Sequence, residues 1–169
     1  MKKLLLIIVL GLLLSGNAYS EMSYDVDKDE FSGKTYHYIM SNYAKPNKPL
    51  SFPYADTESS LIVACLEGGH HYSYIWFNSL NLTGGKTNDG YELHTLEVKA
   101  GGSFENIWAT QDFGKKTLDF NMTKSDKKRI IELMRMNDEI MIQLNHYQDG
   151  KRFYKYDTKG FSKLFDQHC

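Results

Sequence analysis

The amino-acid sequence predicts a mainly β protein with a minor α component: an antiparallel β-sandwich or barrel-like sheet, one helix near residues 124–136 and a short C-terminal helix. Three observations support this fold class. Short runs that are apolar, or that alternate between apolar and polar residues, recur between turns rich in glycine and asparagine, as strands do. Two segments have the apolar spacing of a helix. Since most strands follow one another directly, βαβ units are not expected.

Residues 1–20 have the pattern of a cleaved signal peptide. Two lysines precede an apolar run of eleven residues, 4–14, and Ala18-Tyr19-Ser20 has the small-x-small pattern of a cleavage site. A membrane-spanning helix needs about 20 apolar residues, so this run is too short for an anchor. We expect cleavage after Ser20, a periplasmic or secreted location in a bacterium, and no membrane span in the mature chain.

The mature chain is expected to be mildly acidic. The sequence holds 20 lysines and arginines against 21 acidic residues; residues 1–20 contribute two lysines and no acid, which leaves 18 against 21 and a net charge of −3. This charge gives no reason to expect a nucleic acid or an anionic membrane as partner. The composition does not favour a monomer over an oligomer.

The mature chain is expected to begin with an acidic, flexible arm at residues 21–33, followed by a single β-rich domain at residues 34–169. The first strand is expected at 34–41. All three prolines lie between residues 42 and 60, which predicts a long irregular loop. Loops of this length are uncommon unless they bind a partner or are disordered.

Five more strands are expected before the helix. The run 61–66 is continuously apolar, as in a strand buried on both faces. In 71–80, aromatic residues alternate with residues on the opposite face. The others are expected at 91–99, 104–111 and 117–122, after a turn at 81–90.

The helix has recognisable ends, and a hairpin follows it. Thr123 is a candidate N-cap with Asp126 three residues later, and the helix is expected to end near Asn137. Its apolar stripe comprises Ile130, Ile131, Leu133 and Met134. Beyond it, alternating segments at 140–145 and 152–156 flank an Asp-Gly pair, which predicts a β-hairpin.

The two cysteines, Cys65 and Cys169, predict one structural disulfide. In an oxidising compartment, a cysteine pair without CxxC spacing is typical of such a bond. A short helix at 160–167 would bring Cys169 back to the strand that ends at Cys65. A reactive thiol or a metal ligand is the alternative.

The order of these features resembles a known group of proteins. A strand ending in Cys65, a Gly-Gly-His-His-Tyr segment, Ile107-Trp108 in a strand, Phe120 before a helix, a hairpin and a terminal Cys169 look like the exported single-disulfide β-sandwich proteins of the type VI secretion-associated VasI/TagO kind. The resemblance covers about residues 34–169. Many such relatives carry an Arg-Asp pair before the tryptophan strand, and residues 96–101 hold no arginine. The resemblance implies a non-catalytic periplasmic accessory protein.

Aromatic residues in and around the proline-rich loop predict a surface for a protein partner in the cell envelope. Tyrosine keeps a polar tip at a surface and is an efficient contact residue. The candidate residues are Tyr43, Phe52, Tyr54, Tyr72 and Tyr74.

No catalytic motif, cofactor fingerprint or metal-binding spacing is present in the sequence. A zinc site at His70-His71 would need a third ligand such as His94 or Glu67, and the sequence favours a polar turn there instead. We therefore expect no enzyme activity, no cofactor and no metal.

Two classes of function stay open. The first is a periplasmic, non-catalytic accessory or binding protein linked to envelope or secretion machinery. The second is an inhibitor or immunity-type protein that blocks an envelope-directed hydrolase such as a lysozyme, and an acidic binder suits a basic lysozyme.

Overall fold

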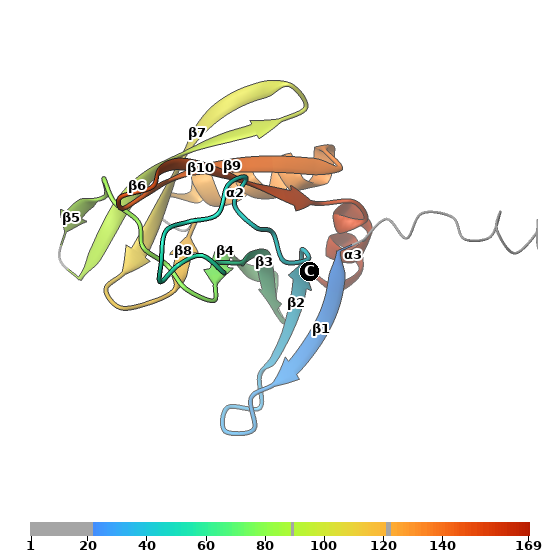
Figure 1. Ribbon diagram of the computed structural model, residues 1–169. Helices are drawn as coiled ribbons and strands as arrows, with labels where there is room; N and C mark the ends of the chain where they lie inside the picture. Colours follow the sequence, from blue (N-terminus) through green and yellow to red (C-terminus); the bar gives the residue numbers. More distant parts are fainter. Residues whose placement is uncertain (1–21, 89, 121–122) are drawn as a thin grey trace, which may run out of the picture.

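The structure is a computed structural model that describes residues 22–88, 90–120 and 123–169 (Figure 1). The expected signal peptide therefore lies outside the described residues. The strands are β1 Ser23–Lys28, β2 Thr35–Met40, β3 Ser59–Leu66, β4 His70–Phe77, β5 Lys86–Asn88, β6 Tyr91–Ala100, β7 Ser103–Asp112, β8 Thr117–Asp119, β9 Glu139–His146 and β10 Gly150–Asp157. The helices are α2 Lys124–Met136 and α3 Phe161–His168. No helix in these described ranges is long and apolar enough to cross a membrane.

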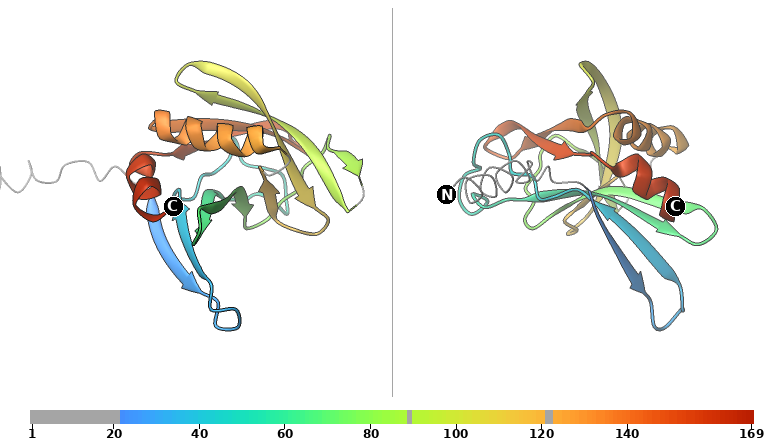
Figure 2. Two further views of the ribbon diagram at one scale, coloured as in Figure 1. Left: turned by 180° about the vertical axis from the view of Figure 1, so that it is seen from behind. Right: turned by 90° about the vertical axis from the view of Figure 1, so that its right-hand side faces the viewer.

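The strands form one antiparallel sheet in the order β1-β2-β3-β4-β8-β7-β6-β9-β10, and β5 pairs with β6. The sheet curls, so β10 returns toward β3 across the core (Figures 1 and 2). Two contacts close this curl: a bridge between Pro46 and Tyr154, and a 2.8 Å hydrogen bond between the Ser59 and Tyr156 hydroxyls. The predicted fold class, mainly β with a helix near 124–136 and a short C-terminal helix, is confirmed.

The prediction of a flexible arm at residues 21–33 is wrong for residues 23–28. These residues form the edge strand β1, which pairs along its whole length with β2. Tyr24 and Val26 alternate with acids, and the acidic composition concealed that strand pattern. The β1–β2 hairpin projects from the body of the molecule, so the acids stay in solvent although the backbone is ordered (Figure 1).

The core lies inside the curl, because alternate residues of each strand point inward. Fully buried residues include Val63, Ile75, Val98, Ile142 and Tyr154. Helix α2 packs against β4, β7 and β9 (Figure 2) and buries its predicted apolar stripe.

Both predicted boundaries of α2 are confirmed. Thr123 is its N-cap, and the Thr123 hydroxyl oxygen accepts a 3.0 Å hydrogen bond from the Asp126 N–H. Asn137 is its C-cap, and the Asn137 amide donates to the Leu133 carbonyl at 2.8 Å.

The predicted disulfide between Cys65 and Cys169 is confirmed, with the two Cα atoms 5.4 Å apart. It fixes α3 against β2, which lies beside β3. The ring of His168 stacks on Tyr24 at 3.8 Å, and the Tyr24 hydroxyl is 2.7 Å from Nδ1 of His37. The C-terminal helix therefore also holds the base of the projecting β1–β2 hairpin.

Candidate functional site

The outer surface of β1, β2, β3 and β4 carries a row of aromatic side chains flanked by acids. The antiparallel register places Tyr38 opposite Ala64 and Ala64 opposite Tyr72, so the small alanine forms a floor between two tyrosines. We call this surface the tyrosine face. It comprises Tyr36, Tyr38, Tyr72, Tyr74 and Trp76, with Asp25, Asp27 and Asp119 on the neighbouring strands β1 and β8.

Strand β3 is buried on both faces because the tyrosine face covers it from outside. Ile62 and Ala64 point outward by register, yet both are buried. This confirms the prediction for the continuous apolar run at 61–66.

The phenols of the tyrosine face are hydrogen-bond donors. Burial raises the pKa of Tyr74 to about 12, and nearby Tyr38 and Asp119 add to the shift. Burial, followed by Asp27, also raises the pKa of Tyr38. These hydroxyls therefore stay protonated at neutral pH, which makes them poor nucleophiles and good contact groups.

The tyrosine face favours cationic groups. Lys127 of α2 already places its Nζ atom 5.4 Å from the centre of the Tyr72 ring. On β1, Asp25 and Asp27 lie opposite Tyr38 and Tyr36 and are exposed to solvent. An aromatic surface bordered by carboxylates attracts lysine and arginine side chains.

A hollow of about 310 Å³ adjoins the tyrosine face at the start of the proline-rich loop. Tyr43 lines this hollow and is 66% exposed, and the centre of its ring lies 6.0 Å from the centre of the Trp76 ring. Its rim is rigid, because the Ser60 hydroxyl donates to the Ser41 carbonyl at 2.7 Å and the Leu61 N–H donates to the Ser41 hydroxyl oxygen at 2.9 Å. The hollow is lined by Ser23, Met40, Ser41, Asn42, Tyr43, Ser60, Ile62 and Trp76.

The structure divides the five predicted partner-binding residues between two places. Tyr43, Tyr72 and Tyr74 belong to the tyrosine face and its adjoining hollow. Phe52 and Tyr54 lie in the part of the loop that approaches the β9–β10 turn, where the N–H and hydroxyl of Ser51 both donate to Asp149.

The acids of the tyrosine face were not among the predicted site residues. Asp25 and Asp27 fell in the expected arm, and only the pairing of β1 with β2 brings them beside Tyr38 and Tyr36. The alternation of Tyr24 and Val26 was the signal that could have revealed the strand.

The histidines considered as zinc ligands are separated by the fold. His70 and His71 begin β4, whereas His94 lies on β6. The His94 side chain is buried, and its Nε2 atom is 3.4 Å from a carboxylate oxygen of Glu92. A Cβ on Gly85 would meet the His94 ring at 2.6 Å, so backbone covers that imidazole. Among the described residues, no three His, Cys, Asp or Glu side chains are grouped to hold a metal ion.

Comparison with known proteins adds no relationship: no family model, curated protein or solved structure matches this chain.

Proposed function

We propose that this protein is an exported, non-catalytic binding protein of the bacterial envelope that holds a basic protein partner against the tyrosine face. The observation that carries the proposal is the tyrosine face itself, where protonated phenols border exposed carboxylates. Such a surface provides directional contacts and charge complementarity, and tyrosine contacts dominate many protein interfaces.

The proposed location has two supports. The Cys65–Cys169 bond is typical of proteins in oxidising compartments, and residues 1–20 have the pattern of a signal peptide. A role beside secretion machinery extends the proposal along the VasI/TagO resemblance.

The test is partner binding by oxidised protein of residues 21–169. Wild-type protein is immobilised, a partner is captured from a native envelope extract and identified, and its Kd is measured with purified components. The Asp25→Asn/Asp27→Asn double variant should weaken binding about tenfold and reduce its salt dependence. Tyr43→Ala/Tyr72→Ala should weaken it by a similar factor.

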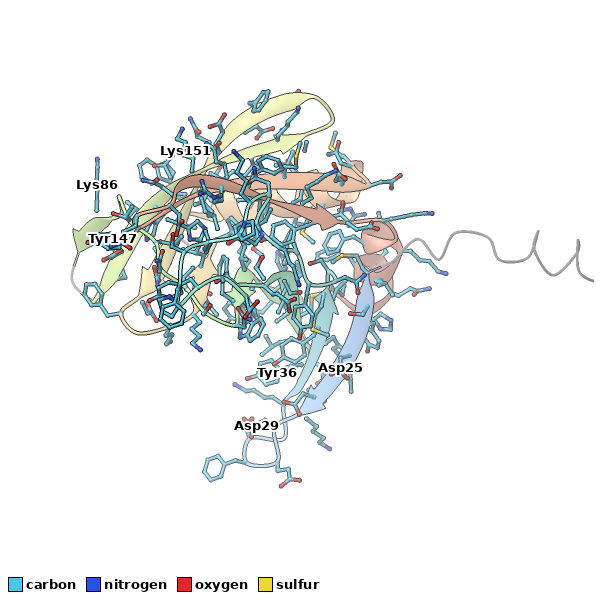
Figure 3. All side chains as sticks on the ribbon, in the orientation of Figure 1. Asp25, Asp29, Tyr36, Lys86, Tyr147 and Lys151 are labelled. Carbon is cyan, nitrogen blue, oxygen red and sulfur yellow. A yellow bond between two sulfur atoms is a disulfide. The ribbon has the colours of Figure 1, made fainter. Side chains whose placement is uncertain are left out.

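Phe31→Ala is the matched control, because Phe31 is fully exposed in the β1–β2 turn that also carries Asp29 (Figure 3), and it is not one of the residues that make up the tyrosine face. An acidic partner, or equal affinity of the control and both face variants, would refute the proposal.

The proline-rich loop favours a second candidate, inhibition of an envelope-directed hydrolase. Phe52 is 92% exposed, yet the loop behind it is held by Ser51–Asp149 hydrogen bonds and by the Asn47 N–H, which donates to the Phe153 carbonyl at 3.0 Å. A rigid loop with an exposed aromatic tip suits insertion into an enzyme cleft.

This second candidate is tested with lysozyme and a peptidoglycan substrate. Wild-type protein should inhibit hydrolysis, Phe52→Ala should lose about tenfold in inhibition, and Tyr72→Ala should lose little. The candidate fails if wild-type protein does not inhibit or if Phe52→Ala inhibits equally well.

A further inference from the structure

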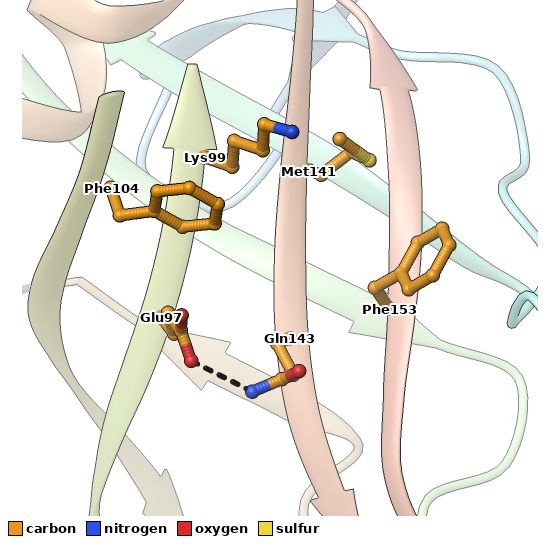
Figure 4. Close-up of a pocket in the computed structure, with 6 residues that line it drawn as sticks. All are labelled: Glu97, Lys99, Phe104, Met141, Gln143 and Phe153. Atoms are coloured by element: carbon orange, nitrogen blue, oxygen red, sulfur yellow. Dashed lines mark hydrogen bonds between the residues drawn. The ribbon is translucent and has the colours of Figure 1, made fainter. Parts of the chain in front are cut away.

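A second surface lies on the other half of the curled sheet, over the outward residues of β7, β6, β9 and β10. A hollow of about 310 Å³ lies there. Figure 4 shows Phe104 and Phe153 on opposite sides of it, with Glu97 and Gln143 between them. Lys99 and Met141 complete its lining. Phe104 is 63% exposed and Phe153 is 38% exposed, so both rings are accessible.

This hollow continues along the strands. A second hollow of about 150 Å³ shares Glu97 and Gln143 with the first and adds Asn106, Asn145 and Lys151. A third, of about 250 Å³, shares Asn145 and Lys151 with the second and reaches Trp108 and Lys86. We call the three together the trough. Lys99 lines the first hollow and Thr95 lines the other two, so the trough follows β6 for about 13 Å at the usual rise per residue.

The trough recognises its ligand mainly through side chains. On this sheet face β6 pairs with β7 along its whole length and with β9 from Glu97 to Ala100, so most backbone N–H and C=O groups are engaged by neighbouring strands. An extended peptide that binds by strand addition needs a free sheet edge instead. A lipid tail needs an enclosed apolar cavity, and the middle of this trough is polar and open.

The side chains of the trough match the chemistry of a sugar chain. Aromatic rings pack against the apolar C–H faces of sugar rings, and amides and carboxylates bond sugar hydroxyls. The Gln143 amide donates to the Glu97 carboxylate at 2.9 Å, so both groups are held in place (Figure 4). Asn106 and Asn145 add further amides along the same line.

The charge of the trough selects among sugar chains. Lys86, Lys99 and Lys151 line it, and Glu97 is its acid. The Nζ atom of Lys99 is 5.2 Å from the Phe104 ring centre, which places a cation beside the aromatic wall. A cationic strip on a chain whose formal net charge is −1 favours an anionic ligand.

We propose that the trough binds an acidic glycan, a polysaccharide segment that carries carboxylates. Its rings stack on Phe104, Phe153 and Trp108, its hydroxyls bond the amides, and its carboxylates meet Lys99 and Lys151. This site is separate from the tyrosine face and does not depend on the proposed partner.

The two tryptophans of the chain make a direct assay possible, because Trp108 lines the trough and Trp76 lies in the tyrosine face. Oxidised protein of residues 21–169 is titrated with a hyaluronan hexasaccharide while tryptophan fluorescence is recorded. We expect a saturable change that Trp76→Phe retains and Trp108→Phe loses. Chitohexaose, a neutral glycan, should bind about tenfold more weakly.

Calorimetry with the same glycan tests the individual side chains. Phe104→Ala/Phe153→Ala should weaken binding about tenfold, and Lys99→Gln/Lys151→Gln should weaken it by a similar factor and flatten its salt dependence. Tyr43→Ala is the matched control and should bind as wild type. A far-UV circular dichroism spectrum for each variant separates loss of binding from loss of fold.

Three results would overturn the proposal. One is the absence of hyaluronan binding at concentrations up to about 1 mM. Another is equal affinity for chitohexaose. The third is wild-type affinity in folded trough variants.

Discussion

The hydroxyl pair of Ser59 on β3 and Tyr156 on β10 offers a quantitative test of how the curled sheet is closed. The two oxygens are 2.8 Å apart, and both residues are fully buried. Burial raises the pKa of Tyr156, and the hydrogen bond with Ser59 opposes that shift. The phenol therefore depends on Ser59 to satisfy its hydroxyl inside the core.

The two single variants should have unequal effects. Ser59→Ala leaves the Tyr156 hydroxyl buried without this partner, which costs about 1–3 kcal/mol of unfolding free energy. Tyr156→Phe should cost about 1 kcal/mol, because the Ser59 hydroxyl still donates to the Ala44 carbonyl at 3.4 Å. The double variant removes both polar groups, so its loss should fall below the sum of the two by about 1–2 kcal/mol.

The measurement is urea unfolding of the four oxidised proteins at pH 7, followed by tryptophan fluorescence. Tyr147→Phe serves as a control, because Tyr147 is exposed and its loss of a hydroxyl should change stability little. Additive losses to within about 0.5 kcal/mol would refute the reasoning, since they would show that the two hydroxyls do not depend on each other.

Three other predictions concern the disulfide, a buried histidine and a close backbone approach. Cys65→Ala/Cys169→Ala should lower the unfolding free energy by about 4–5 kcal/mol in the chain-entropy account, because the bond closes a separation of 104 residues. A loss below about 1 kcal/mol in urea unfolding would contradict this prediction. Burial lowers the pKa of His146 to about 4, below its value in the unfolded chain. The unfolded state therefore binds more protons, and the free energy of unfolding should fall as the pH drops from about 6.5 toward 4. His146→Gln should flatten this pH dependence, and an unchanged slope would contradict the prediction. Gly85→Ala should lower the thermal midpoint, because the new Cβ would lie 2.6 Å from the His94 ring. Gly85 is not among the glycines with positive φ, so the loss would come from this clash, and an unchanged midpoint would contradict it.

Local features of this protein could be predicted from the sequence because their causes are local. The Thr123 cap and the apolar stripe determine α2, and the alternation in β4 separates Tyr72 and Tyr74 from Ile75. The Asp-Gly turn needs a residue that tolerates positive φ, and Gly150 has a φ of 68°. The disulfide was predictable because the signal-peptide pattern of residues 1–20 implies an oxidising compartment.

The arrangement of surfaces was decided by tertiary structure, because strand register joins residues that are far apart in the sequence. The pairing of Asp25 with Tyr38 brings the acids to the tyrosine face, and the pairing of Glu97 with Gln143 builds the floor of the trough. Residues 86–88 also became a strand inside an expected turn, because the edge of β6 accepts them. Periodicity assigns each side chain to one face of its own strand, whereas the free energy of packing the whole sheet selects its neighbours.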